Sequence, residues 1–250
     1  MPFSRLPRRD PRTVARDIPG VLDVLFPRLT GGLVRSLNKE SFSFSDIEAV
    51  SDELIGKSRL QKAMLFELSM ARAESLLRGE APSDWDECLR IASSRQKQHY
   101  DAKIPDKLSR YDIEVADHAA SNLIVMLKSI QMQCPNLPLE HGPLIPGLGW
   151  IASGRGDFAI GSMLIEVKHT EENFRSGDFR QVLMYWLLKY AKSVEDNDSI
   201  WSEILLLNPR RNSALRIKYE YLIRSASAGL NRIELVELLR SAAVQEVARR

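Results

Sequence analysis

Hydrophobic and polar positions alternate on both sides of Gly161-Ser162, and this alternation is the clearest pattern in the chain. Glycine at the first central position suits a two-residue type II′ turn, so residues 157–168 are expected to form a β-hairpin. Side chains alternate between the two faces of a strand, and one face of this hairpin is then wholly apolar. Its apolar positions are Phe158, Ile160, Met163, Ile165 and Val167. The other face carries Asp157, Glu166 and Lys168.

Asp157 and Glu166 lie directly opposite each other in this register, with Cβ atoms about 5 Å apart. Like charges so placed are destabilising unless a positive charge lies between them. A divalent cation suits the position, because Mg²⁺ prefers oxygen ligands and takes one or two carboxylates. Lys168 extends the same edge and suits a phosphate oxygen or an attacking water. The alternative is a ribbon with a charged solvent face, on which Asp, Glu and Lys are ordinary residues.

A helical pattern follows the hairpin from Phe179 to about Lys192, with Asp178 or a neighbour as its N-cap. Gln181 and Tyr185 are four residues apart and therefore lie on one side of this helix. The opposite side is apolar, with Val182, Leu183, Trp186, Leu187 and Tyr190. The pattern thus predicts a helix that packs through its apolar side and presents the amide of Gln181 and the phenol of Tyr185 on the other.

Three segments together, Gly156-Asp157, Glu166-Val167-Lys168 and Gln181-x-x-x-Tyr185, resemble the PD-(D/E)XK nuclease superfamily, in particular its RecB-like and Cas4-like branch. The resemblance covers residues 110–223, and Gly156 stands where the family has Pro. It implies that Asp157 and Glu166, with the carbonyl of Val167, bind Mg²⁺ or Mn²⁺. It further implies that Lys168 positions the nucleophile and that Gln181 and Tyr185 support the site and the substrate.

The fold implied is α/β, a restriction-endonuclease-like core with a central mixed sheet flanked by helices, over residues 106–250. Ile204–Leu207 is continuously apolar and predicts a buried strand, and Leu215–Ile223 alternates like an outer strand. Residues 148–153 are expected to form a strand leading to Asp157, after an irregular Pro-rich stretch at 134–147. A closing amphipathic helix is expected over Leu230–Arg249.

Residues 1–105 are expected to form an all-helical N-terminal extension with a basic arm. The predicted helices are 46–54, opened by a capping box at Ser45 and Glu48, then 57–78, 84–100 and, at the start of the core, 106–132. Glu67 and Glu74 are interpreted as exposed helix carboxylates. The arm at residues 1–19 is interpreted as a solvated, partly disordered terminus, with a phosphate-gripping arm as the alternative.

A further metal ligand is expected from the helix before the hairpin, since the family often places one there. Asp117 borders the apolar stripe and is the candidate, whereas Glu114 and His118 lie farther round the polar face; all three are equally compatible with surface positions. Arg180, Arg210 and Arg211 are candidates for phosphate contacts, and an ordinary basic loop explains the last two equally well.

The composition limits the classes of function and location that the chain is expected to have. The chain has 250 residues and a net charge of +2, so any nucleic-acid site must come from local basic clusters. The two cysteines, Cys88 and Cys134, have no metal-ligand spacing and indicate no disulfide framework. No P-loop occurs, and neither a signal peptide nor a membrane-spanning apolar run is recognised. A cytoplasmic location with no membrane partner is therefore expected.

The expected function is a Mg²⁺- or Mn²⁺-dependent deoxyribonuclease, with DNA favoured on family grounds and restriction or anti-phage defence as its setting. The alternatives are a repair or recombination exonuclease and a non-catalytic nucleic-acid-binding subunit that keeps the fold. A helicase or ATPase, another defence-system subunit, or a second copy of the chain are the partners considered.

Overall fold

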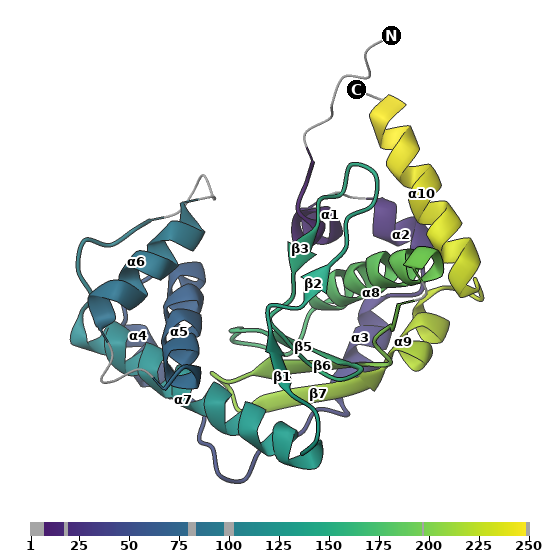
Figure 1. Ribbon diagram of the computed structural model, residues 1–250. Coiled ribbons are helices and arrows are strands. Elements are labelled where there is room, and N and C mark those ends of the chain that lie inside the picture. Colours follow the sequence, from purple (N-terminus) through teal and green to yellow (C-terminus); the bar gives the residue numbers. More distant parts are fainter. Residues whose placement is uncertain (1–7, 18–19, 80–83, 98–102, 197, 249–250) are drawn as a thin grey trace.

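A five-stranded mixed sheet lies at the centre of the protein, with helices on both faces (Figure 1). The computed structural model describes residues 8–17, 20–79, 84–97, 103–196 and 198–248. The strand order is β1-β4-β5-β6-β7, in which β5 and β6 are parallel and the other neighbours are antiparallel. The strands are β1 Leu139–His141, β4 Phe158–Ile160, β5 Met163–Val167, β6 Glu203–Asn208 and β7 Ser213–Lys218. The predicted α/β class with a mixed sheet is thereby confirmed.

The hairpin of β4 and β5 has the predicted register. Phe158 pairs with Ile165 and Ile160 with Met163 across the turn. Gly161 has φ +53°, and a Cβ there would lie 2.7 Å from Leu137 Cδ1, so both backbone conformation and space require glycine. The apolar face of the hairpin packs against the long helix α7, Arg110–Gln133.

Helix α8, Ser176–Asp196, covers the other face of the sheet and is the most deeply buried helix of the core. Its apolar side packs on alternate residues of β5, β6 and β7, among them Leu164, Leu206 and Leu215. The indole of Trp186 donates to the carbonyl of Trp201 at 3.0 Å, which fastens the helix to the segment entering β6. Helix α8 therefore packs directly on β5 and its neighbouring strands.

The helices of the N-terminal region pack in two different apolar clusters. Helices α1 Pro11–Asp17, α2 Val21–Leu25 and α3 Gly31–Asn38 belong to the apolar cluster around α8. Helices α4 Asp52–Lys57, α5 Lys62–Leu77 and α6 Trp85–Gln96 pack instead with the first half of α7 in a separate cluster. Figure 1 shows this second group standing beside the sheet, joined to it by α7.

The partly disordered arm expected at residues 1–19 is wrong for residues 11–17, which form α1; residues 1–7 and 18–19 lie outside the described part. Asp10 Oδ1 accepts hydrogen bonds from the backbone N–H groups of Arg12 and Thr13, and Pro11 occupies the first helical position. Asp at the N-cap followed by Pro is a helix-start signal.

The capping box expected at Ser45 is also wrong, because α4 begins later, with Ser51 as its N-cap. The side chain of Asn212 binds the backbone of Phe44 and Ile47 and holds this segment out of a helix. The remaining predicted helices at 57–78, 84–100 and 106–132 are present with shorter or shifted ends, and residues 98–100 lie outside the described part.

Three further segments differ from expectation. The Pro-rich stretch contains the edge strand β1, which pairs with β4. Residues 148–153 do not form a regular strand; instead β2 Leu144–Ile145 and β3 Gly154–Arg155 make a small ribbon above the sheet. The outer strand expected over Leu215–Ile223 ends at Lys218, where α9 Tyr219–Ala226 begins, and α10 Arg232–Ala248 closes the described chain. No helix of the described ranges is long and apolar enough to span a bilayer.

Candidate active site

The two predicted carboxylates meet where β4 begins and β5 ends. Asp157 directly precedes β4, and its Oδ2 accepts a hydrogen bond from the Val167 N–H at 2.7 Å. Glu166 is fully buried, and its Oε2 has no hydrogen-bond partner among the described residues. A buried carboxylate oxygen without a partner is costly. The strand pairing thus places one unsatisfied anionic oxygen beside a second carboxylate.

Lys168, Gln181 and Tyr185 complete a hydrogen-bonded network around Glu166. Lys168 Nζ lies 3.1 Å from Glu166 Oε1 and 2.9 Å from Gln181 Oε1. Gln181 Nε2 donates to Glu166 Oε1 and, at 2.9 Å, to the hydroxyl of Tyr185. Asp178 Oδ1, in the first turn of α8, is 4.0 Å from Lys168 Nζ. The structure therefore brings together all five residues of the predicted motif, counting Asp157.

Burial shifts the pKa values of Asp157 and Tyr185. Desolvation, reinforced by the neighbouring charge of Glu166, raises the pKa of Asp157, although Arg12, Lys168 and the Val167 N–H partly offset this rise. Burial and the charge of Glu166 likewise raise the pKa of Tyr185, so its hydroxyl stays protonated. Burial and the charge of Glu166 thus disfavour a second negative charge in the site.

Arg12 of α1 reaches the carboxylates from the N-terminal region. Its Nη2 lies 3.6 Å from Glu166 Oε1 and 4.0 Å from Asp157 Oδ1, and the guanidinium donates to the Tyr185 hydroxyl. One turn further along α1, Arg16 Nη2 donates to Asp178 Oδ1 at 3.0 Å. Neither arginine was predicted to lie in the site; the helix-start signal at Asp10-Pro11 was the available clue.

A cavity of about 640 Å³ opens beside the carboxylates. Glu166, Lys168 and His169 form one wall, and Arg12 and Arg16 form another. The third wall comes from the separate helical group, with Lys62 and Glu67 of α5 and Gln96 of α6. The helical group is thus part of the site.

Glu67 and Glu74, both expected to be exposed, are largely covered. Burial raises the pKa of Glu67, partly offset by Arg95 and Arg12. Glu74 is 7% exposed and accepts from Arg95 and from His141 of β1. Glu67 faces the cavity, whereas Glu74 joins the helical group to the edge of the sheet.

His169 follows Lys168 and also borders the cavity. Both of its ring nitrogens are buried and lack hydrogen-bond partners among the described residues. Burial, with the charge of Arg210, lowers the pKa of His169 to about 3, so the imidazole is neutral. Its ring lies 6.4 Å from that of Phe66 on α5. His169 is a neutral, aromatic part of the cavity wall.

Asp117 is engaged elsewhere. Its Oδ1 accepts from Arg72 Nε at 2.7 Å, and Arg72 lies over the ring of Trp85. Asp117 therefore contributes to the contact between α5, α6 and α7 and is not among the residues that line the cavity. Of the helix carboxylates discussed from the sequence, Glu67 of α5 and Asp178 of α8 line the cavity, whereas Asp117 does not.

The three candidate phosphate ligands form internal contacts. Arg180 pairs with Asp23 of α2. Arg210 is 3% exposed and lies 3.5 Å from Glu171 Oε1. Arg211 is exposed, and its guanidinium donates to the carbonyl of Glu171. Arg210 and Arg211 therefore hold the loop that follows β5.

Oxygen atoms make up the candidate donor set for a cation. Asp157 and Glu166 offer carboxylate oxygens, Val167 a backbone carbonyl, and Glu166 Oε2 is the oxygen left without a partner. Two carboxylates with bound waters suit Mg²⁺ or Mn²⁺. Among the residues that the structure describes, no group of three or more His, Cys, Asp or Glu side chains forms a metal cage. The residues present fit a cation that retains several of its waters.

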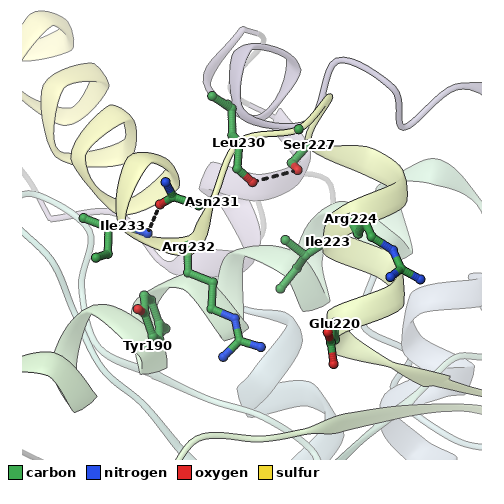
Figure 2. A pocket seen from close by; sticks show the side chains of 10 residues that line it. Tyr190, Glu220, Ile223, Arg224, Ser227, Leu230, Asn231, Arg232 and Ile233 are labelled. Atoms are coloured by element: carbon green, nitrogen blue, oxygen red, sulfur yellow. Dashed lines mark hydrogen bonds between the residues drawn. The ribbon is translucent and has the colours of Figure 1, made fainter.

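A second cavity, of about 490 Å³, lies between α9 and α10 (Figure 2). Figure 2 shows Arg224 and Arg232 beside Glu220 on its rim, together with Tyr190. Asn231 caps α10, with its Oδ1 accepting from the backbone of Ile233 and Glu234. Asn231 and Ser227 bind backbone groups at the ends of these helices, and the guanidinium of Arg232 lies over the ring of Trp186, which gives these polar groups a structural explanation.

Comparisons with known proteins do not place the chain in a family. A scan against protein-family models finds no match, and searches of curated proteins and of solved structures find none either. The function of the site therefore has to be inferred from its own residues and geometry.

Proposed function

We propose that this protein is a metal-dependent nuclease that hydrolyses phosphodiester bonds in DNA. One observation carries the proposal: in the described part of the chain, Glu166 Oε2 is buried without a hydrogen-bond partner beside Asp157, in a network that also holds Lys168. Buried anionic oxygens without partners are rare because they are costly, and a bound cation would relieve this cost.

The fold supports the same proposal. The resemblance to PD-(D/E)XK nucleases implies a mixed sheet with a helix on each face, a hairpin that carries the acidic residues, and a following helix that carries Gln and Tyr. The arrangement of β4, β5 and α8 agrees with this expectation. This architecture and the motif that it carries support a restriction-endonuclease-like core.

Asp157, Glu166 and the Val167 carbonyl would hold Mg²⁺ or Mn²⁺. When bound, such an ion lowers the pKa of a coordinated water and neutralises charge on the phosphorane-like transition state. Gln181 keeps Lys168 in place through its carbonyl oxygen, at 2.9 Å. Lys168 thereby presents a fixed positive charge to an incoming phosphate oxygen or to the attacking water.

DNA and a role in restriction or anti-phage defence are proposed on the resemblance. The cavity supports a nucleic-acid substrate because Arg12, Arg16 and Lys62 border it beside the acidic pair. Positively charged side chains that contact phosphates contribute an affinity that does not depend on the nucleotide sequence.

The test is cleavage of supercoiled plasmid, linear duplex and single-stranded DNA with Mg²⁺, Mn²⁺ or EDTA. We expect metal-dependent cleavage that Lys168→Gln and Asp157→Asn abolish. Lys192→Gln, which removes an exposed lysine from α8, is the matched control and should cleave like the wild type. Thermal unfolding of each variant shows whether it is folded.

Metal-independent cleavage, or cleavage that survives both site variants, would refute this assignment. If no substrate is cleaved, calorimetric titration with Mn²⁺ separates the remaining cases. Mn²⁺ binding that Asp157→Asn abolishes would keep the metal site and remove the catalytic claim for the isolated chain. No Mn²⁺ binding would refute the metal site itself.

A further inference from the structure

Arg12 lies beside the carboxylates in the position where a cation is needed. Its Nη2 is within 4.0 Å of both Asp157 Oδ1 and Glu166 Oε1. Burial alone would lower the pKa of Arg12, but the negative charges of Glu166 and Asp157 and a hydrogen bond to Tyr185 outweigh it and raise the pKa, so the guanidinium remains charged. With Lys168, Arg12 balances the two carboxylates without any metal ion.

Helix α1 holds Arg12 firmly in this region. Val14 and Ala15 are buried in the cluster around α8. Arg16 forms its ion pair with Asp178 on the same face of the helix. Just before the helix, Arg9 exchanges backbone hydrogen bonds with Trp150 and Ala152. The helix therefore cannot leave the site without breaking packing, an ion pair and backbone hydrogen bonds.

The guanidinium itself is held less tightly than its helix. The distances of 3.6 Å and 4.0 Å to the carboxylates are ion-pair distances, longer than hydrogen bonds, so the contact that a rotation would have to break is the hydrogen bond to the Tyr185 hydroxyl. The side chain of Arg12 is 38% exposed and borders the cavity, so it can rotate away while α1 stays in place. By contrast, Lys168 is 7% exposed and hydrogen-bonded on two sides.

We propose that Arg12 is an internal counter-cation that neutralises the carboxylate pair before metal binds and is displaced into the cavity when a divalent ion enters. This inference rests on the proposed function, because it requires a metal site at Asp157 and Glu166. A divalent ion and a guanidinium beside the same two carboxylates repel each other, and only Arg12 has a route out. Displacement adds a cation to the cavity wall where a phosphate would bind.

The experiment is calorimetric titration of Mn²⁺ into wild type, Arg12→Gln and Arg16→Gln at low ionic strength. Arg16 is the matched control because it lies one turn away on α1 and is similarly exposed, at 39%. We expect Arg12→Gln to bind Mn²⁺ about tenfold or more tightly than wild type, and Arg16→Gln to differ from wild type by no more than about threefold. Asp157→Asn in the Arg12→Gln background should abolish binding.

Each other outcome overturns the inference. Equal or weaker Mn²⁺ binding by Arg12→Gln would mean that Arg12 does not compete with the ion, while leaving the metal site and the proposed function intact. An equal gain in Mn²⁺ affinity in Arg12→Gln and Arg16→Gln would mean that removing either nearby positive charge has the same effect, so that Arg12 has no specific role. Absence of Mn²⁺ binding in every variant would refute the proposed metal site and this inference together.

A second readout follows the side chain directly. In protein labelled with ¹⁵N-arginine, the Arg12 Nε–Hε resonance is identified by its loss in Arg12→Gln. We expect Mg²⁺ to shift this resonance, with smaller changes for the Arg16 side chain. An Arg12 resonance that does not respond to saturating Mg²⁺ would contradict displacement.

Discussion

Lys168 and Gln181 are joined by a hydrogen bond of 2.9 Å from the ammonium to the amide oxygen, and both side chains are buried. The amide nitrogen of Gln181 donates at the same time to Glu166 and Tyr185. Gln181 thus satisfies three polar groups at once and fixes the position of the lysine relative to the carboxylate. An aspartate or glutamate here could not donate, and an apolar residue could do neither.

Gln181→Leu keeps the approximate volume but leaves Lys168, Glu166 and Tyr185 each short of a partner. We expect unfolding free energy to fall by roughly 2–4 kcal/mol, since each buried polar group left unsatisfied costs about 1–3 kcal/mol and the groups partly relax. Urea unfolding at neutral pH measures this loss. Gln133→Leu, at an exposed position that ends α7, is the control and should change stability little. A stable Gln181→Leu protein would show that the network contributes little to the fold.

Asp157→Asn is expected to stabilise the metal-free protein while removing cation binding. Asn retains an oxygen to accept from the Val167 N–H but removes the charge opposite Glu166. Because the pKa of Asp157 is raised in the folded state, the stability linked to its proton is present at low pH and is lost as pH rises through the folded pKa. The advantage of Asn should therefore grow from pH 5 to pH 8, reaching roughly 1–2 kcal/mol.

Thermal unfolding in EDTA at both pH values measures this difference, with Asp106→Asn, at an exposed site, as the control. Saturating Mn²⁺ should reverse the order, because it stabilises the wild type by mass action and leaves Asp157→Asn unchanged. A variant that is less stable than wild type at pH 8 in EDTA would mean that Arg12 and Lys168 more than neutralise the aspartate.

Glu74 provides an acid-sensitive link between the helical group and the sheet. Burial alone would raise the pKa of Glu74, but hydrogen bonds from His141 and Arg95 outweigh it and lower the pKa to about 2. A depressed folded pKa gives stability that is present above the unfolded value of about 4.5 and is lost as pH falls through the folded value. Wild type should accordingly lose on the order of 2–3 kcal/mol through this group between pH 5 and pH 2.

Glu74→Gln removes this pH-dependent contribution, so its stability should fall less steeply with acid than that of wild type. Urea unfolding at several pH values measures the slope. Glu114→Gln, an exposed carboxylate on α7, should preserve the wild-type slope. Equal slopes for wild type and Glu74→Gln would show that the Glu74 contacts are not maintained in solution.

The hairpin, the identity of its two faces and the helix with Gln181 and Tyr185 were predictable because they depend on short-range periodicity and one turn. Register follows from the turn at Gly161, and register alone brings Asp157 to Glu166. Register and alternation placed Asp157, Glu166 and Lys168 on one face, and the resemblance to PD-(D/E)XK nucleases implied that Gln181 and Tyr185 join them. The predictable part of the site is the part encoded within one continuous segment of the chain.

Contacts between distant segments were not predictable in this way. Arg12 reaches the carboxylates only because α1 packs on α8, and the extended segment around Phe44 depends on the side chain of Asn212. Strand β1 is three residues long, follows Pro138, and becomes a strand only because β4 offers it an edge. In each case tertiary pairing decides the local structure and outweighs the local pattern.

Mutations can also show which helix carboxylate contributes to binding of the proposed cation. The sequence favoured Asp117, but that side chain is bound to Arg72 at 2.7 Å. Glu67 of α5 lines the cavity together with Glu166, in a position where Arg12 and Arg95 attract its charge.

We expect Glu67→Gln to weaken Mn²⁺ binding about threefold to tenfold, because an additional anion near Asp157 and Glu166 favours a divalent cation through space or through a bound water. Asp117→Asn should bind Mn²⁺ like wild type and lower the thermal stability instead. Calorimetry and thermal unfolding of the two variants, measured side by side, give opposite patterns for the two carboxylates. Weaker Mn²⁺ binding in Asp117→Asn with unchanged binding in Glu67→Gln would return Asp117 to the metal site and would require the first half of α7 to lie closer to β5 in solution.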